Sequence, residues 1–264
     1  MKSHDPAVGV SPRERHLVVY LPCYNEEENI GPLMDQWLAL EEELLERGFV
    51  LTVKPVDDGS TDGTREVIAS FQREHTNIAP IFHRVNQNLG GVLRTSVHNF
   101  LDHHREGDLM CVMDGDNTHD PKYILSMLDA LTKNTLDVVI ASRYQRGSDI
   151  EGLAPHRDIL SRFAKLYYSM ILQIPGVRDY TCGYRLYDYG ILKRARDHYG
   201  TQLIEESSFA CMMELLFKLH GEGAKIGEIP FILRYDRKEG ASKMSILKTS
   251  WRSLRGAIKL RKNS

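Results

Sequence analysis

The sequence lacks the cysteine patterns of zinc sites and of disulfide frameworks. Its 264 residues include only four cysteines, at positions 23, 111, 182 and 211. None of them belongs to a CxxC pair or to a Cys/His spacing that would bind a metal. Three of the four lie in apolar or strand-like surroundings. We therefore expect buried free thiols in a reducing compartment.

A long apolar run is also missing. The longest stretch without a charged residue covers 166–177 and is interrupted by Gln173, Pro175 and Gly176, whereas a membrane-spanning helix needs about 20 apolar residues. The N-terminal residues are polar, and the apolar run after them, 16–23, is too short for a signal peptide. We expect no transmembrane helix, and a cytoplasmic protein that can attach peripherally to the cytoplasmic face of a membrane.

The chain has no strong net charge. Its formal value of −2 argues against a general nucleic-acid-binding surface, so we expect no nucleic-acid partner. The charge is uneven, however, because nine Lys/Arg and one acid follow from Arg237 onward. Residues 244–264 combine basic positions with an apolar stripe at helical spacing, which predicts a basic amphipathic helix. Such a helix would lie on an anionic membrane surface or pack on the rest of the chain, and the pattern favours neither.

What the sequence does contain is a regular alternation of strand and helix patterns. Strands are predicted at 17–21, 49–56, 78–83 and 109–113, and helices at 28–47, 64–74 and 92–103. This order is typical of an α/β fold with a mostly parallel sheet and helices on both faces. We predict a flexible segment at 1–16, one α/β domain at 17–243 and the basic helix at 244–264.

The most informative stretch is Met110–Pro121. Apolar residues are followed at once by Asp114, Gly115 and Asp116, which predicts a buried strand that ends by presenting two carboxylates. Carboxylates at i and i+2 share a face and can hold one hard cation, Mg²⁺ or Mn²⁺, which keeps positions open for phosphates. For this motif alone, an acidic surface turn is the alternative.

Two further polar clusters follow predicted strands in the same way, Tyr24-Asn25-Glu26 and Asp57-Asp58. Ligands of parallel α/β sheets bind outside the carboxyl ends of the strands, so the three clusters are expected to meet. A surface-turn explanation would now need three coincidences. Because no GxGxxG or GxxxxGK[ST] spacing is present, a nucleotide would bind through acidic groups and a metal.

An ordered set of motifs carries a resemblance to a known family. The motifs are LPCYNE (21–26), VDDGSTDG (56–63), NLGG (88–91), MDGD (113–116), ASRY (141–144) and DYTCGYRL (179–186). Together they resemble a family 2 glycosyltransferase of GT-A fold, which has a Rossmann-like sheet. Within that family they are most similar to dolichol-phosphate or polyprenyl-phosphate mannose or glucose synthases. The resemblance runs from about residue 17 to residue 245.

The resemblance implies a role for each motif. The nucleotide-sugar-binding residues would be Pro22, Tyr24, Asn25, Glu26, Asp57, Asp58, Asn88, Gly90, Gly91, Asp114 and Asp116. Asp114 and Asp116 would hold Mg²⁺ or Mn²⁺ against the diphosphate, with Thr118 a weaker candidate ligand. The metal would stabilise charge on the leaving nucleoside diphosphate, and inversion at the anomeric carbon is expected.

The acceptor would be met by a basic cluster. Acceptor or phosphate contacts are expected from Arg143, Arg157, Arg185, Arg237, Ser242 and Lys243, because guanidinium forks match phosphate oxygens. The catalytic residues would be Asp116, Asp179, Arg143 and Glu214. A polyprenyl phosphate is already anionic and needs no general base, whereas a hydroxyl acceptor does, and Asp179 and Glu214 are the candidates. Glu214 lies in an otherwise apolar helix, so a structural contact is its alternative role.

The resemblance thus predicts a metal-dependent inverting glycosyltransferase that moves a hexose to a polyprenyl phosphate. GDP-mannose is the first donor to consider and a UDP-sugar the second. Asp-Gly-Asp stands where Asp-Ala-Asp is frequent in the synthases, which leaves the donor sugar open. The alternatives are the same fold acting on a soluble or glycan hydroxyl, and a non-catalytic nucleotide-sugar-binding subunit. A lipid acceptor would require a membrane surface or a membrane-protein partner, and an apolar helix predicted at 159–172 offers a second membrane contact.

Overall fold

The protein is built around a mixed seven-stranded sheet. In the computed structural model, the described residues are 14–151, 166–234 and 236. The strands of the large sheet follow the order β3-β2-β1-β4-β7-β5-β8, and β6 and β9 form a separate two-stranded sheet. Their bounds are β1 Arg15–Cys23, β2 Phe49–Asp57, β3 Ile81–Phe82, β4 Leu109–Val112, β5 Val138–Ser142, β6 Asp149–Glu151, β7 Arg185–Asp188, β8 Ile226–Pro230 and β9 Ile232–Arg234.

Strand direction explains where the motifs meet. β1 pairs in parallel with β2 and β4, so the carboxyl ends of these strands lie at one edge. β7 runs antiparallel between β4 and β5, with Val112 and Ile140 both opposite Arg185. The beginning of β7 therefore lies at the same edge as the ends of β4 and β5. The predicted α/β fold with a mostly parallel sheet is confirmed, and the antiparallel β7 is an addition that the sequence pattern did not predict.

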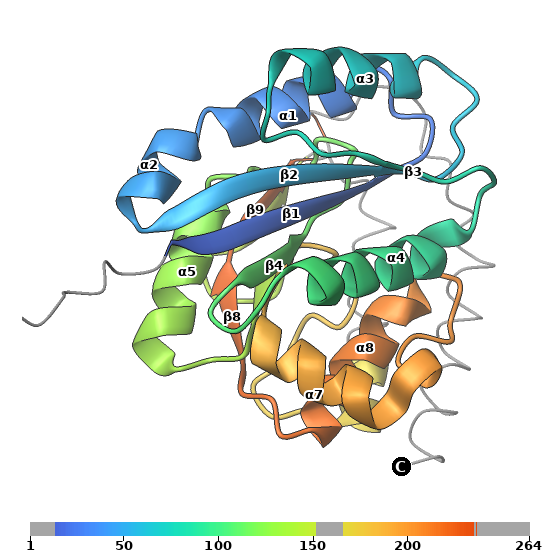
Figure 1. Ribbon diagram of the computed structural model, residues 1–264. Helices are drawn as coiled ribbons and strands as arrows, with labels where there is room; N and C mark the ends of the chain where they lie inside the picture. The colour runs from blue at the N-terminus through green and yellow to red at the C-terminus, as the bar shows by residue number, and fades with distance from the viewer. Residues whose placement is uncertain (1–13, 152–165, 235, 237–264) are drawn as a thin grey trace, which may run out of the picture.

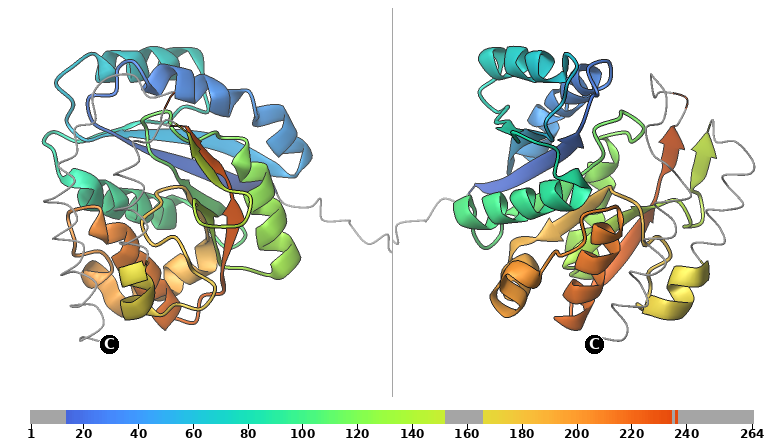
Figure 2. Two further views of the ribbon diagram at one scale, coloured as in Figure 1. Left: turned by 180° about the vertical axis from the view of Figure 1, so that it is seen from behind. Right: turned by 90° about the vertical axis from the view of Figure 1, so that its right-hand side faces the viewer.

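Helices cover both faces of this sheet (Figure 1 and Figure 2). Helices α1, α2 and α3 lie on one side of β1 and β2, and α4, α7 and α8 lie on the other. α5 packs on β5 and β8. The bounds are α1 Ile30–Leu38, α2 Glu41–Glu46, α3 Thr64–Glu74, α4 Asn88–His103, α5 Tyr123–Asn134, α7 Tyr189–Tyr199 and α8 Ala210–Gly221, with a short 3-10 helix at Gly200–Gln202 and a further helical stretch at 166–172.

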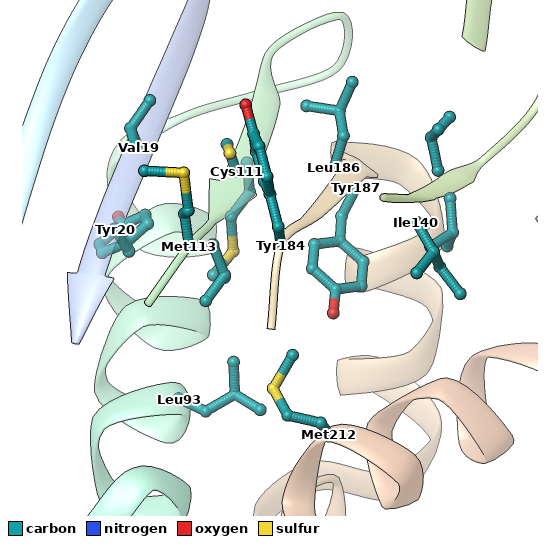
Figure 3. Packing of buried hydrophobic residues seen from close by; sticks show 14 of the residues in the cluster. Val19, Tyr20, Leu93, Cys111, Met113, Ile140, Tyr184, Leu186, Tyr187 and Met212 are labelled. Carbon is teal, nitrogen blue, oxygen red and sulfur yellow. The ribbon is translucent and has the colours of Figure 1, made fainter. Parts of the chain in front are cut away.

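The core lies between the sheet and these helices. The central strands are buried on both faces, as the continuous run Leu17 to Leu21 shows, and such runs are typical of parallel sheets. Figure 3 shows Leu93 of α4 and Met212 of α8 facing side chains of the sheet such as Tyr187. All four cysteines are free and buried, as predicted. Among the described residues no helix combines the length and the apolar character that a membrane crossing requires.

Three predicted elements differ from those observed. The helix expected at 28–47 is two helices, α1 and α2, because the chain tightens at Leu40, whose amide donates to Trp37 O at 3.0 Å. The strand expected at 78–83 pairs only at Ile81–Phe82, with an isolated bridge at Ile78. Pro80 between them has no N–H to donate to a ladder. The helix expected from residue 92 begins at Asn88, so the predicted glycine loop is its first turn.

Several predictions concern residues outside the described ranges. These are the basic helix at 244–264, the first half of the helix expected at 159–172, and the acceptor residues Arg157, Arg237, Ser242 and Lys243. The N-terminal segment predicted at 1–16 is described only from residue 14, and β1 begins within it at Arg15.

Candidate functional site

The two candidate metal ligands lie in the turn that follows β4. Asp114 and Asp116 are both partly exposed, and Gly115 between them donates its amide to Pro22 O at the end of β1, at 3.1 Å. Asp114 packs against Gly183, where a Cβ atom would lie 2.5 Å from Asp114 Oδ1. Only glycine leaves room for the carboxylate at that position. The metal motif is thus held between β1 and the loop that leads into β7.

This donor set fits a hard divalent cation bound together with a diphosphate. The described residues contain no group of three or more His, Cys, Asp or Glu side chains that could hold a metal alone. Two carboxylates with phosphate oxygens and water are the usual surroundings of Mg²⁺. Thr118 donates its hydroxyl to Asp116 Oδ1 at 2.7 Å, which makes it a support of the carboxylate. Asp114 and Asp116 would hold the cation, which would supply electrostatic stabilisation of the leaving diphosphate.

The Asp57-Asp58 motif at the end of β2 divides into two roles. Asp57 is fully buried, with Oδ1 accepting from Ser60 N at 3.1 Å and Oδ2 from Arg65 Nη2 at 2.7 Å. Asp58 Oδ1 accepts from His83 Nδ1 at 2.7 Å and from Gln87 N at 2.9 Å, while its Oδ2 has no hydrogen-bond partner among the described residues. Asp58 is also buried, at 3% exposed, but it keeps one carboxylate oxygen uncommitted, and its predicted contact with a base or ribose stays a prediction. Both oxygens of Asp57 are engaged inside the protein, where they anchor Arg65 and the Ser60 amide, and its predicted ligand role stays a prediction.

The loop after β1 combines one exposed side chain with two side chains that are held by hydrogen bonds within the protein. Tyr24 is 39% exposed, as a stacking platform would be. Asn25 adopts a left-handed conformation, and its Oδ1 accepts from Thr61 N at 2.7 Å. Glu26 Oε2 accepts from Asn29 Nδ2 at 2.8 Å, and Pro22 is the register partner of Val56. Asn25 thus ties this loop to the loop that follows Asp58.

The predicted glycine loop lies at the start of α4, where Asn88, Gly90 and Gly91 form the first turn. Gly90 donates its amide to Ser207 O at 3.0 Å, and a Cβ atom here would lie 1.9 Å from Glu206 O. Close packing of two backbones thus explains why glycine occupies position 90. The contact between Gly90 and the nucleotide sugar stays a prediction.

Arg143 and Asp179 form a bidentate pair beside the metal motif, in which Asp179 is fully buried and the Arg143 side chain is 15% exposed. Arg143 follows β5, and its Nε and Nη2 donate to the two Asp179 oxygens at 2.8 and 2.7 Å. Nη2 also donates to Thr181 Oγ1 at 2.6 Å, whereas Nη1 has no partner among the described residues. Burial alone would raise the pKa of Asp179, but the charge and hydrogen bonds of Arg143 outweigh it and lower the pKa from 3.8 to about 2. Asp179 is therefore a fixed anion that orients Arg143, and a poor general base.

Two other predicted site residues have structural roles. Glu214 Oε2 accepts from the amides of Glu205 and Glu206 at 2.9 and 2.8 Å, and Oε1 accepts from Lys218 Nζ at 2.7 Å. With both oxygens engaged, Glu214 holds the loop that packs on Gly90, and it is not placed as a general base. Arg185 is fully buried and donates to Met212 O and Tyr180 O. It therefore lies in the core, and the phosphate contact predicted for it stays a prediction that these bonds do not support.

His119 is a site residue that the sequence analysis did not single out. Its ring stacks on Phe231 at 5.3 Å between centroids and meets the edge of Tyr184 at 5.8 Å. Burial lowers the pKa of His119 from 6.5 to about 4, although nearby Asp116 acts in the opposite direction. The imidazole is therefore neutral at pH 7. The only sequence signal was its place three residues after Asp116.

We expect the protein to lose stability as the pH falls from about 6.5 to 4. In the unfolded chain His119 takes up a proton near its ordinary pKa of 6.5, whereas the folded chain resists protonation down to about 4. The contribution of His119 to the free energy of unfolding is therefore fully present above pH 6.5, the pKa of the unfolded chain. It amounts to about 3 kcal/mol, at about 1.36 kcal/mol per pKa unit. Urea unfolding between pH 7 and 4.5 would measure the decline. His119→Phe should make it shallower, and an unchanged slope in this variant would contradict the assignment.

Comparisons with known proteins agree with this geometry. Residues 18–196 match the model of glycosyl transferase family 2. The chain is 28% identical over 242 residues to a polyprenol monophosphomannose synthase of Mycolicibacterium smegmatis, covering 91% of this chain and 84% of that protein. It is 29% identical over 229 residues to an undecaprenyl-phosphate mannosyltransferase of Micrococcus luteus, covering 87% of each.

A solved structure is similar in fold. Glucosyl-3-phosphoglycerate synthase from Mycobacterium tuberculosis, in complex with Mn²⁺, UDP-glucose and phosphoglyceric acid, superposes with a TM-score of 0.66 at 17% identity. The superposition covers 94% of this chain and 80% of that one. Because the family model spans more than half of the sequence and the fold agrees, the chain belongs to glycosyl transferase family 2 and is a glycosyltransferase of GT-A fold.

Proposed function

We propose that this glycosyltransferase moves mannose from a nucleotide diphosphate sugar to a polyprenyl phosphate. The names of the two relatives, a polyprenol monophosphomannose synthase and an undecaprenyl-phosphate mannosyltransferase, support this sugar and this acceptor. GDP-mannose is the first candidate donor and a UDP-sugar the second. Inversion at the anomeric carbon is part of the proposal.

The observation that carries the acceptor assignment is the clamp between Arg143 and Asp179. Asp179 takes one edge of the guanidinium and leaves Nη1 without a partner among the described residues. A charged donor edge held beside the metal motif suits a phosphate oxygen. The two carboxylates considered as general bases, Asp179 and Glu214, are both saturated by donors. An acceptor that is already anionic needs neither of them.

On the donor side, each group has one task in the proposed reaction. Tyr24 would stack on the base and Asp58 Oδ2 would accept from a base or ribose donor. Asp114 and Asp116 would hold Mg²⁺ or Mn²⁺, which neutralises charge on the diphosphate as it leaves. The glucosyl-3-phosphoglycerate synthase structure, which is similar in fold, contains Mn²⁺ and UDP-glucose. This supports a divalent cation in the proposed reaction, either Mg²⁺ or Mn²⁺.

The test compares acceptors that differ only in the phosphate. Labelled GDP-mannose, UDP-glucose and UDP-N-acetylglucosamine would each be incubated with a short polyprenyl phosphate or the matching polyprenol, with Mg²⁺ or Mn²⁺. We expect label in the organic phase from GDP-mannose and the phosphate form only. Equal labelling of the polyprenol would replace the lipid phosphate with a hydroxyl acceptor. Donor binding without transfer to either lipid would instead favour another hydroxyl acceptor or a binding subunit.

A further inference from the structure

Beneath the metal motif, three buried side chains form a continuous chain of polar contacts that ends on Asp116. Cys182 Sγ lies 3.7 Å from His119 Nε2, and His119 Nδ1 lies 3.2 Å from Thr118 Oγ1. Thr118 Oγ1 in turn donates to Asp116 Oδ1 at 2.7 Å. Thr118, His119 and Cys182 are each at most 4% exposed. Water therefore has little access to these contacts.

The donors and acceptors along this chain fix its direction. A carboxylate only accepts, so the single hydroxyl proton of Thr118 points to Asp116. Thr118 Oγ1 must then accept from His119, which places the imidazole proton on Nδ1. Nε2 is left as an acceptor and faces the thiol of Cys182. Burial raises the pKa of that thiol to about 12, so it keeps its proton and can donate it.

Aromatic walls hold the imidazole in the required orientation. Its plane is 11° from that of Phe231 and 87° from that of Tyr184, whose ring also appears in Figure 3. A second restraint acts on the backbone, because Thr118 O accepts from Arg234 N at 2.9 Å. The ring and the loop thus have little freedom to turn Nδ1 away from Thr118.

We propose that His119 is a positioning residue that aims the Asp116 carboxylate at the metal by fixing the direction of the Thr118 hydroxyl. The inference rests on the proposed metal role of Asp114 and Asp116. Groups that hydrogen-bond to a metal ligand orient it, and removing one typically weakens metal affinity by about 10–100-fold.

The first experiment measures Mn²⁺ affinity in the presence of GDP or UDP by electron paramagnetic resonance. His119→Phe keeps an aromatic ring between Phe231 and Tyr184 but removes both nitrogens, so we expect about 10–100-fold weaker binding. His119→Asn returns a donor near the position of Nδ1 and should recover part of the affinity. The matched control is His104→Phe, at a half-buried histidine that stacks on Phe100, and it should bind Mn²⁺ like the wild type. Equal affinity of wild type and His119→Phe would overturn the inference.

A double-mutant cycle separates positioning from general packing. Thr118→Val removes the hydroxyl and preserves the shape, so it should weaken Mn²⁺ binding to a similar extent. If both residues act through one hydrogen bond, the variant carrying His119→Phe and Thr118→Val should be no weaker than either single variant. If the losses of Mn²⁺ affinity in the two single variants multiply in the double variant, the two residues act independently. That result would contradict the proposed series of hydrogen bonds.

A third measurement needs no metal. In ¹⁵N-labelled protein, the long-range imidazole correlations of His119 should show a protonated Nδ1 and an unprotonated Nε2. The opposite tautomer would overturn the inference directly. If the wild type binds no Mn²⁺ with either nucleotide, the proposed metal site fails and the inference fails with it. If the wild type binds and only the predicted loss is missing, the proposed function stands and the inference alone is wrong.

Discussion

Asp116→Asn should reduce sugar transfer by about 1,000-fold or more, which corresponds to about 4 kcal/mol of transition-state stabilisation. The amide can still accept the Thr118 hydroxyl that Asp116 accepts at 2.7 Å, so the turn after β4 should keep its shape. What it loses is the negative charge that would hold the proposed cation against the diphosphate. Initial rates with labelled donor and polyprenyl phosphate measure the effect, and the melting temperature confirms folding.

The matched control is Asp120→Asn in the same loop. Asp120 Oδ1 accepts from the Lys122 amide before α5 at 3.0 Å, and an asparagine oxygen can do the same. We expect its activity within about threefold of the wild type, because surface substitutions of this kind cost little. If Asp116→Asn retained a tenth or more of the wild-type rate, Asp116 would not be an essential metal ligand.

The second large effect is expected on stability. Asp179→Ala leaves the largely buried Arg143 guanidinium without its partner and removes the acceptor of the Thr181 and Cys182 amides. Breaking a buried ion pair from one side typically costs about 3–5 kcal/mol. Urea unfolding at pH 7 would measure the loss, and transfer should fall as well because Arg143 would no longer be aimed.

An exposed pair of the same type provides the comparison. Asp129 contacts Arg47 at 2.8 Å, close to the 2.7 Å of the buried pair, but its side chain is 69% exposed. Asp129→Ala should therefore change the free energy of unfolding by no more than about 1 kcal/mol. Similar losses in the two variants would mean that burial does not decide the strength of the Arg143–Asp179 pair.

The fold could be predicted where the signals are local. Apolar runs that end in polar turns identify β1, β2 and β4, because a buried parallel strand is recognisable from its own residues. The place of β7 could not be predicted, since only its pairing with β4 and β5 decides that it runs antiparallel. The break between α1 and α2 likewise follows from the tightened turn at Leu40, and helical periodicity continues across it.

In the site, too, features with a local sequence pattern could be predicted, and features that depend on tertiary packing could not. Asp114 and Asp116 could be predicted because two carboxylates directly after a strand are a local pattern. Arg143 and Arg185 both lie in family-like motifs, yet one is at the end of β5 and the other is inside the core. Asp57 and Asp58 are neighbours that differ in their partners, because successive residues of an extended chain point to opposite sides. Such differences depend on tertiary packing, which the sequence pattern does not contain.

The antiparallel β7 also has a consequence for engineering. The motifs proposed for the donor precede or directly follow β4, whereas the Arg143–Asp179 pair comes later in the chain, and β4 and β7 meet along one ladder of hydrogen bonds. A chimera could therefore join the part of the chain that ends with α5 to the later part of a relative, and the two parts would meet along this ladder. Exchanging the segment after α5 with that of a relative should transplant acceptor choice while the recipient keeps its own nucleotide preference.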